Sequence, residues 1–317
     1  MRIGLDAMGG DFAPRAVVEG AVDALPHMGN TDRIVLIGDE TQIREELGLL
    51  GVDPGLFDIV HADQVITMAD HPAKAFSQKR NSSIAVGFGL LKSGQIDGFS
   101  SAGNTGAMLV GASYTVNVIP GIFRPALAAI VPSVNGGSSL LLDVGINPDC
   151  KPDVLLQYGI LGSLFSKHVL GIDNPTVALI NIGEEETKGS AAVRSAYEIM
   201  KDNPDINFVG NVEGNLLFSE NMPDVLVCDG FVGNVIIKQA EAFYNVCKSK
   251  NITDSFFERF DFENIGGTPV IGVNANVVIG HGISNRKAIM NMIFRTVEVV
   301  KADLANRIKI TLSNGKN

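Results

Sequence analysis

Short apolar runs alternate with longer helical patterns along almost the whole chain. Nine runs have the length and residue content of strands: 2–6, 33–38, 57–61, 96–99, 127–132, 138–143, 176–182, 206–211 and 224–229. Helical patterns separate many of them, at 14–25, 82–94, 154–169 and 191–202. This alternation predicts an α/β fold on a mostly parallel sheet. The 317 residues are enough for one large domain or two lobes.

Composition excludes several classes of protein. A formal charge of −10 argues against a nucleic-acid binder that neutralises phosphates. The three cysteines have no CxxC spacing, which argues against a disulfide framework or a zinc site and favours a reduced cytoplasmic compartment. The N-terminal stretch MRIGLDAMGGD lacks the apolar run of a signal peptide.

The familiar catalytic motifs are missing. There is no P-loop, no GxSxG elbow and no HExxH, and GFGLLK at 87–92 lacks the third glycine of a dinucleotide fingerprint. The five histidines are scattered without ligand spacing, so we expect neither a metal nor a cofactor. No Ser–His or Cys–His spacing predicts a covalent intermediate.

Glycine-rich polar turns follow five of the expected strands and precede helices. They lie at 6–14, 100–107, 143–152, 181–190 and 228–234. One such turn is more often structural, because turns need Gly and helix caps need Asp, Ser or Asn. Five at one sheet edge favour a site for a polar, anionic ligand.

The stretch SSAGNTGAMLVGA at 100–112 permits two interpretations, a plain turn before a core helix or a cradle for an anion. Arg124 is the single charged residue in 98–142, a region that we expect to form a buried helix and strand. Because an isolated buried charge is costly, Arg124 either pairs with an acid such as Asp143 or binds an anion. The residues alone leave both questions open.

Seven motifs in order resemble the bacterial phosphate acyltransferases of phospholipid synthesis. They are DAMGGDFAP, SSAGNTGA, LLDVGINPDCKP, NIGEEETKG, VGNVEGN, VCDGFVGN and GHGISN, spread from Met1 to about residue 300. The resemblance implies a three-layer α/β/α fold like isopropylmalate dehydrogenase and phosphotransacetylase, with two lobes around a cleft in a single 1–317 domain, and a homodimer. It also implies the reaction, in which acyl-[acyl carrier protein] and inorganic phosphate give acyl phosphate. A membrane-bound glycerol-3-phosphate acyltransferase is a candidate further partner.

We assign roles to individual residues from the chemistry of this reaction. Phosphate is a competent nucleophile, so positioning and charge stabilisation can supply most of the catalysis by direct transfer. The expected phosphate and substrate contacts are Asp6, Gly9, Gly10, Asp11, Ser101, Gly103, Asn104, Thr105, Gly106, Arg124, Asp143, Asn147, Asn181, Gly183, Asp229, Gly230 and Gly233. The alternative for Ser101 and Asn104 is capping of the helix that follows them.

Three further residues are candidates for catalysis. Asn234 is a polar residue in an apolar helix start. Lys188, which follows three glutamates, either points into the cleft or balances those acids. His281, between two glycines, is either a structural histidine or the general acid that protonates the departing thiolate. Four residues are expected to contact phosphate or the acidic carrier protein, or else to form a solvated helix face: Lys74, Lys79, Arg80 and Ser82.

The segment 238–265 places Phe256, Phe257 and Phe260 on one expected helical face. In the family this region forms part of the dimer and touches the membrane. Membrane-surface helices are usually cationic, whereas this segment has four Lys or Arg against five Asp or Glu. Dimer packing is therefore the favoured interpretation, with any membrane association peripheral.

Two other functions stay open. One is a phosphotransacetylase or NAD-dependent dehydrogenase of the same fold, because a fold does not fix a function. The other is a non-catalytic scaffold that docks the carrier protein, although a scaffold has no use for so many polar turns.

Overall fold

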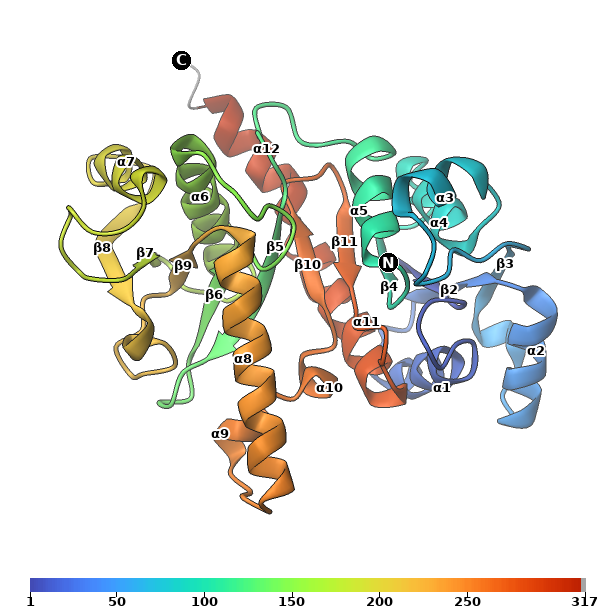
Figure 1. The fold of residues 1–317 in the computed structure, drawn as a ribbon. Helices are drawn as coiled ribbons and strands as arrows, with labels where there is room; N and C mark the ends of the chain where they lie inside the picture. The colour runs from blue at the N-terminus through green and yellow to red at the C-terminus, as the bar shows by residue number, and fades with distance from the viewer. Residues whose placement is uncertain (315–317) are drawn as a thin grey trace. The chain divides into compact units, whose positions relative to one another are not determined.

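The computed structural model describes residues 1–314 and divides the chain into two compact units (Figure 1). Unit 1 comprises residues 1–118 and 262–305, and unit 2 comprises residues 119–261 and the chain from 306 onward. Each unit has its own run of hydrogen-bonded strands with helices packed on them. The predicted α/β fold class is confirmed.

In unit 1 the strands follow the order β3-β2-β1-β4-β11-β10. Among these described strands, β10 is antiparallel to β11 and the other pairs are parallel. The strands are β1 (Arg2–Asp6), β2 (Arg33–Gly38), β3 (Asp58–His61), β4 (Gly98–Ser101), β10 (Thr268–Ile271) and β11 (Asn276–Ile279). The helices are α1 (Arg15–Ala24), α2 (Glu40–Leu49), α3 (Pro72–Gln78), α4 (Ser83–Lys92), α5 (Thr105–Tyr114), α10 (Phe262–Ile265) and α11 (Arg286–Lys301), with 3₁₀ turns η1 (Leu25–His27) and η2 (Pro54–Leu56).

The helices of unit 1 form layers on the sheet. Helices α1 and α11 pack together, and α4 packs on α5 and on β1, β2 and β4 (Figure 1). The chain crosses the sheet in one direction from β1 to β2 and in the other direction from β3 to β4. Because such connections are right-handed, the helices of the two crossovers lie on opposite faces of the sheet. Gly20 of α1 allows the close contact with α11, because a Cβ there would lie 2.6 Å from the Arg286 carbonyl oxygen.

The core of unit 1 lies between the sheet and the α1–α11 pair. Its fully buried members include Ile3, Leu5, Ile34, Leu36 and Ile293. Full burial of such a side chain contributes roughly 1.5–3 kcal/mol. The strands pack on this core, and the loops described below follow their carboxyl ends.

In unit 2 the strand order is β5-β6-β9-β7-β8, with β5 antiparallel to β6 and the other pairs parallel. The strands are β5 (Ala126–Pro132), β6 (Ser138–Leu142), β7 (Thr176–Asn181), β8 (Asn207–Glu213) and β9 (Val225–Val227). The helices are α6 (Pro152–His168), α7 (Ala191–Met200), α8 (Gly230–Ser249), α9 (Ser255–Glu258) and α12 (Leu304–Asn314), with a 3₁₀ turn η3 (Gly214–Leu216). Helices α6 and α7 pack on the strands, whereas the long helix α8 extends away from them with α9 beside it (Figure 1).

All nine predicted strands are present within a residue or two of the expected bounds, and the four helical patterns are helices. Two strands were missed, β10 and β11. Each has four residues, and Pro269 in β10 has no N–H to give a sheet ladder. The segment 238–265 is not one helix, because α8 ends at Ser249 and the rest forms α9, α10 and turns.

Candidate active site

Three loops of unit 1 meet at the carboxyl ends of the neighbouring strands β1, β4 and β11. The Gly280 N–H donates to the Ser101 carbonyl oxygen at 2.9 Å, which joins the loop after β11 to the end of β4. The Asp11 N–H donates to the Gly282 carbonyl oxygen at 2.7 Å, which joins that loop to the one after β1. The motifs DAMGGDFAP, SSAGNTGA and GHGISN therefore form one cluster.

Asp6 lies beneath this cluster and holds it together. Ser101 Oγ donates to Asp6 Oδ2 at 2.6 Å and accepts from the Gly103 N–H at 2.9 Å. Burial raises the pKa of the Asp6 carboxyl above its ordinary value, although hydrogen bonds from Ser101, Ser83 and the Met8 N–H act in the opposite sense. Asp6 is 1% exposed and Ser101 fully buried. Both side chains therefore position the loops, and their expected contact with phosphate stays a prediction.

The glycines here allow the loops to approach each other. A Cβ on Gly9 would lie 2.4 Å from Asp6 Oδ2 and 2.8 Å from the Gly103 nitrogen. Gly10 has φ +105°, a conformation that L side chains rarely adopt. Gly9, an expected phosphate contact, thus packs against the protein itself. The side chain of Asp11 is exposed.

The stretch at 100–112 is a helix cap. Asn104 Oδ1 accepts from the Ala107 N–H at 2.9 Å, and Nδ2 donates to the carbonyl oxygens of Thr67 at 3.0 Å and Asp70 at 3.1 Å. Asn104 therefore caps α5, the alternative given for it above, and its contact with a ligand stays a prediction. The N–H groups of Thr105 and Gly106, in the first turn of α5, have no acceptor within the helix. They can donate to an anion at this helix N-terminus.

The four residues expected to contact phosphate or the carrier protein divide into two kinds: Lys79 and Ser82 are engaged within the protein, and Lys74 and Arg80 are exposed. Lys79 Nζ pairs with Asp70 at 2.6 Å and donates to the Val65 carbonyl oxygen at 2.8 Å, and this contact lowers the pKa of Asp70. Ser82 is fully buried and caps α4 through the Ala85 N–H. Neither fits the expected contact with phosphate or carrier protein. Lys74 and Arg80 are exposed, and neither forms an ion pair with residues 1–314.

His281 is half-buried in the loop after β11. Its ring centroid lies 5.3 Å from that of Phe262, and its carbonyl oxygen accepts from the Ser284 N–H at 2.9 Å. The loop also carries Gly282, which bonds the loop after β1. His281 therefore lies in the same cluster as the α5 N-terminus, and its role as an acid stays a prediction.

Unit 2 has its own loop cluster, centred on Asp143 after β6. The Asp143 carboxylate accepts from the backbone N–H groups of Leu127 at 3.0 Å, Ile146 at 3.1 Å and Asn147 at 2.6 Å. Burial raises the pKa of Asp143 and these hydrogen bonds oppose that effect. Asn147 Nδ2 in turn contacts the Pro125 carbonyl oxygen and the Tyr158 hydroxyl at 2.8 and 2.7 Å. Both side chains are buried and position the surrounding loops, and their expected contact with substrate stays a prediction.

Arg124 does not pair with Asp143. It is exposed, and within the described chain it makes no ion pair. It lies just before β5, whose first residues pair with the carboxyl end of β6. Burial raises the pKa of the Cys150 thiol to about 11, and the charge of Arg124 acts in the opposite sense. The ion-pair alternative is excluded, and anion binding stays a prediction.

Helix α8 begins against the same cluster. Asp229 caps it by accepting from the Val232 N–H at 2.9 Å, which is a structural role. A Cβ on Gly230 would lie 2.7 Å from Asp143 Oδ2, and one on Gly233 would lie 2.0 Å from the Asp143 carbonyl oxygen. Both glycines therefore serve helix–loop contact. Asn234 is exposed, with Nδ2 3.4 Å from the Val144 carbonyl oxygen, and remains accessible to a ligand.

The loop after β7 stands apart from the Asp143 cluster. Asn181 bonds within the loop, accepting from the Ile182 N–H and donating to the Lys188 carbonyl oxygen. Gly183 is buried, and Lys188 Nζ lies 3.9 Å from Glu185 Oε1 on the surface. The loop is joined to β8 by Asn211, which donates to the Glu184 and Glu185 carbonyl oxygens. Lys188 thus lies beside an acid that it can balance, and its catalytic role stays a prediction.

Sequence reasoning missed Tyr158 and Asp70. Tyr158 is a fully buried tyrosine in α6 that contacts Asn147, and burial raises its pKa. Asp70 neutralises Lys79 and supports Asn104. Asp70 immediately precedes His71 and Pro72 at the start of α3, and nothing in the sequence distinguishes it from an ordinary loop acid. Tyr158 could have been found, because a tyrosine in an apolar helix needs a hydrogen-bond partner for its hydroxyl.

Within residues 1–314 no group of three or more His, Cys, Asp and Glu is arranged to hold a metal ion. No helix in that range combines the length and apolarity that a membrane crossing requires.

Comparison with known proteins agrees with the motifs. The family model described as "Fatty acid synthesis protein" matches residues 1–307. The phosphate acyltransferase of Dictyoglomus thermophilum is 39% identical, over 99% of this chain and 98% of that protein. That of Pelotomaculum thermopropionicum is 42% identical, over 97% and 93%.

Two solved structures share the fold at low identity. A phosphotransacetylase from Streptococcus pyogenes superposes with a TM-score of 0.66 at 16% identity, covering 96% of this chain and 94% of that one. A 4-hydroxythreonine-4-phosphate dehydrogenase from Klebsiella pneumoniae gives 0.56 at 13% identity, covering 95% and 98%.

Proposed function

Because the chain belongs to the fatty acid synthesis protein family that includes the phosphate acyltransferases, and is an acyltransferase, we propose that it makes acyl phosphate from a long-chain acyl-[acyl carrier protein] and inorganic phosphate. The observation that carries the proposal is similarity of about 40% identity over nearly the whole chain to proteins named phosphate acyltransferase. The reaction is a first step toward glycerolipids. The enzyme works in the cytoplasm as a homodimer, with a membrane-bound glycerol-3-phosphate acyltransferase as a candidate partner.

Phosphate attacks the thioester directly. A phosphate oxygen forms a bond to the thioester carbon, the carbon–sulfur bond breaks, and the pantetheine sulfur leaves with the electron pair. Positioned donors stabilise the charge that develops on the carbonyl oxygen. In unit 1 the accessible donors are the N–H groups of Thr105 and Gly106, and His281 is the acid that gives the thiolate its proton. Unit 2 offers separate donors of its own, the side chains of Arg124 and Asn234.

The carrier protein is bound through its acidic surface. Lys74 and Arg80 are the exposed cations beside the loop cluster of unit 1. Complementary charges at the rim of an interface speed association more than they add affinity.

The test is a direct assay of product. The purified protein is incubated with hexadecanoyl-[acyl carrier protein] and phosphate, and acyl phosphate is trapped with hydroxylamine and identified by mass. Parallel reactions contain acetyl-CoA with phosphate, or a hydroxy acid with NAD. Acyl phosphate from the long-chain donor supports the proposal, whereas turnover of acetyl-CoA or the hydroxy acid alone refutes it in favour of a relative of the same fold.

A further inference from the structure

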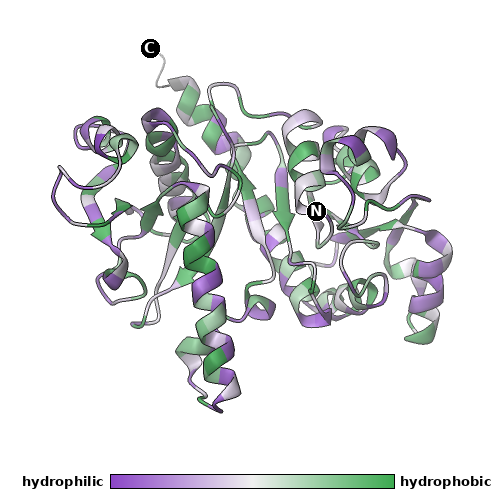
Figure 2. Cartoon of the chain, in the orientation of Figure 1, coloured by the Kyte–Doolittle hydropathy of each residue, from purple (hydrophilic) through white to green (hydrophobic). Residues whose placement is uncertain are grey.

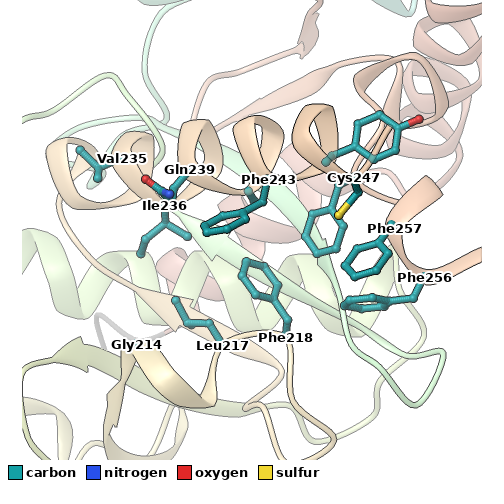
Figure 3. A pocket seen from close by; sticks show the side chains of 13 residues that line it. Gly214, Leu217, Phe218, Val235, Ile236, Gln239, Phe243, Cys247, Phe256 and Phe257 are labelled. Carbon is teal, nitrogen blue, oxygen red and sulfur yellow. The ribbon is translucent and has the colours of Figure 1, made fainter. Parts of the chain in front are cut away.

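An apolar groove lies along helix α8, with a cavity of about 550 Å³ (Figure 3). One wall is α8 itself, from Val235 to Cys247, and the opposite wall is the turn that carries Leu217 and Phe218. Phe256, Phe257 and Phe260 come from α9 and the turn after it and close the end near Cys247. A cavity of this size is within the roughly 300–1,000 Å³ of small-molecule sites.

The lining is almost wholly apolar. Gln239 is a polar side chain on the α8 wall, and the Tyr244 hydroxyl bonds Asp261 at 2.9 Å instead of a ligand. The ribbon of α8 and α9 carries several stretches in the green of hydrophobic residues (Figure 2). Val235 is 51% and Phe243 60% exposed, so the groove is open along one side. Open apolar surface of this kind marks a site where an apolar partner binds.

The aromatic end is fixed in place. The ring of Phe260 packs on those of Phe218 and Phe256, with centroids 5.0 and 5.2 Å apart. The Arg259 guanidinium donates to the Ser133 carbonyl oxygen at 3.0 Å and to Ser138 Oγ at 2.9 Å, which ties α9 to the β5–β6 turn. The groove therefore has a firm closed end rather than a mobile flap.

The other end adjoins the candidate site. Val235 follows Asn234 directly, and Asn234 lies over the loop after Asp143. From Val235 to Cys247 the helix advances about 18 Å at 1.5 Å per residue. An extended hexadecanoyl chain has nearly the same length, about 19 Å, given ~1.25 Å of advance for each C–C bond of ~1.5 Å.

We propose that this groove holds the acyl chain of the donor, with the thioester at Asn234 and the terminal methyl group at the Phe256–Phe257 end. The inference rests on the proposed function, since it names the part of unit 2 that recognises the long-chain substrate. The groove's length then sets the chain-length preference, because each methylene that enters it adds about 0.8 kcal/mol of favourable burial. A face that only packs on a second copy has no need of a hollow that begins beside Asn234 and matches the acyl chain in length.

The test blocks the groove halfway. Ala240 lines it about 7.5 Å from Val235 along the helix axis, and Ala242 is exposed on the same helix outside the lining. We expect Ala240→Trp to lower kcat/KM for hexadecanoyl-[acyl carrier protein] by about tenfold or more and to leave the butanoyl donor within about twofold, because only the longer chain passes the block. Ala242→Trp should leave both donors near wild type. An equal loss for both donors, no loss for either, or a loss that follows dissociation of a dimer in sedimentation overturns the proposal.

A binding measurement separates this inference from the proposed function. The sequence contains no tryptophan, so Phe257→Trp introduces a single indole at the closed end of the groove. Hexadecanoyl-pantetheine should change the emission of that indole and butanoyl-pantetheine should not. If wild type forms no acyl phosphate but the indole responds to the long chain alone, the function fails and the groove stands. No response to the long chain overturns the groove even if the enzyme is active.

Discussion

Ser101 Oγ donates a 2.6 Å hydrogen bond to Asp6 Oδ2, and both side chains are buried at the carboxyl ends of adjacent strands. The bond joins the loop after β1 to the loop after β4, and the same hydroxyl accepts from Gly103. The turn that leads into α5 is thus held by the buried carboxyl group of Asp6. Thr105, the first residue of α5, is exposed.

The first prediction concerns pH. Because burial raises the pKa of Asp6 above 3.8, the folded protein keeps a proton there at pH values where the unfolded chain has lost it. The stability associated with this group therefore falls as pH rises from 3.8 through the folded pKa. Asp6→Asn removes the titrating group. The unfolding free energy of the variant minus that of wild type should therefore become more positive as pH increases. Urea unfolding from about pH 4 to about pH 7 measures it, and a difference independent of pH contradicts the assignment.

The second prediction concerns the start of α8. A Cβ at Gly233 would lie 2.0 Å from the Asp143 carbonyl oxygen, so Gly233→Ala must displace the helix or the loop. We expect a loss of about 1–3 kcal/mol in unfolding free energy and loss of acyltransferase activity. Gly89 is the matched control, because it is an exposed helical glycine with nothing within 4 Å of a Cβ. Gly89→Ala should stabilise by roughly 0.5–1 kcal/mol. Equal effects of the two variants would count against close packing at Gly233.

The architecture followed from the sequence because each strand carries its own signal. Runs such as Arg33–Gly38 are apolar and end in a turn residue, and burial in a parallel sheet demands that pattern. Strand β10 was not predicted, because a proline such as Pro269 normally argues against a strand. Tertiary pairing with β11 overrides that local preference.

The site was predicted at the level of loops and not of side chains. The motifs marked the loops that meet, but Asp6, Asn104 and Asp143 turned out to use their polar atoms on the protein itself. Sequence cannot distinguish a side chain that binds a ligand from one that positions the loop, since both need a polar group beside a glycine. Lys79 was misread for the same reason, because its partner Asp70 is nine residues away.

The third prediction concerns carrier-protein docking. Replacing both Lys74 and Arg80 by Ala should raise KM for the acyl carrier protein donor about two- to tenfold at low salt, with the difference shrinking at high salt as charges are screened. The small donor hexadecanoyl-pantetheine should show no change in KM. Lys92→Ala is the control, an exposed cation at the opposite end of α4 from Arg80. Steady-state kinetics at two ionic strengths measure the effect, and an equal change with both donors would argue against docking.

The fourth prediction concerns His281 as general acid. His281→Ala should lower kcat by about 10²- to 10⁴-fold and remove the fall in rate on the alkaline side of the pH profile, because the thiolate then leaves unprotonated. His27→Ala is the matched control, since each ring packs on a phenylalanine, Phe294 at 5.6 Å for His27 and Phe262 at 5.3 Å for His281. Near-normal turnover of the His281 variant with the hexadecanoyl donor would eliminate this role.

The most direct measurement is the phosphate dependence of thiol release from hexadecanoyl-[acyl carrier protein]. Stopped mixtures are analysed for free carrier thiol and for acyl phosphate, with and without phosphate, at enzyme concentrations high enough to detect a single turnover. Direct transfer predicts one thiol and one acyl phosphate per event, saturation with phosphate, and no burst of thiol when phosphate is absent. A burst equal to the enzyme concentration without phosphate, or thiol release that yields no acyl phosphate, would contradict the account.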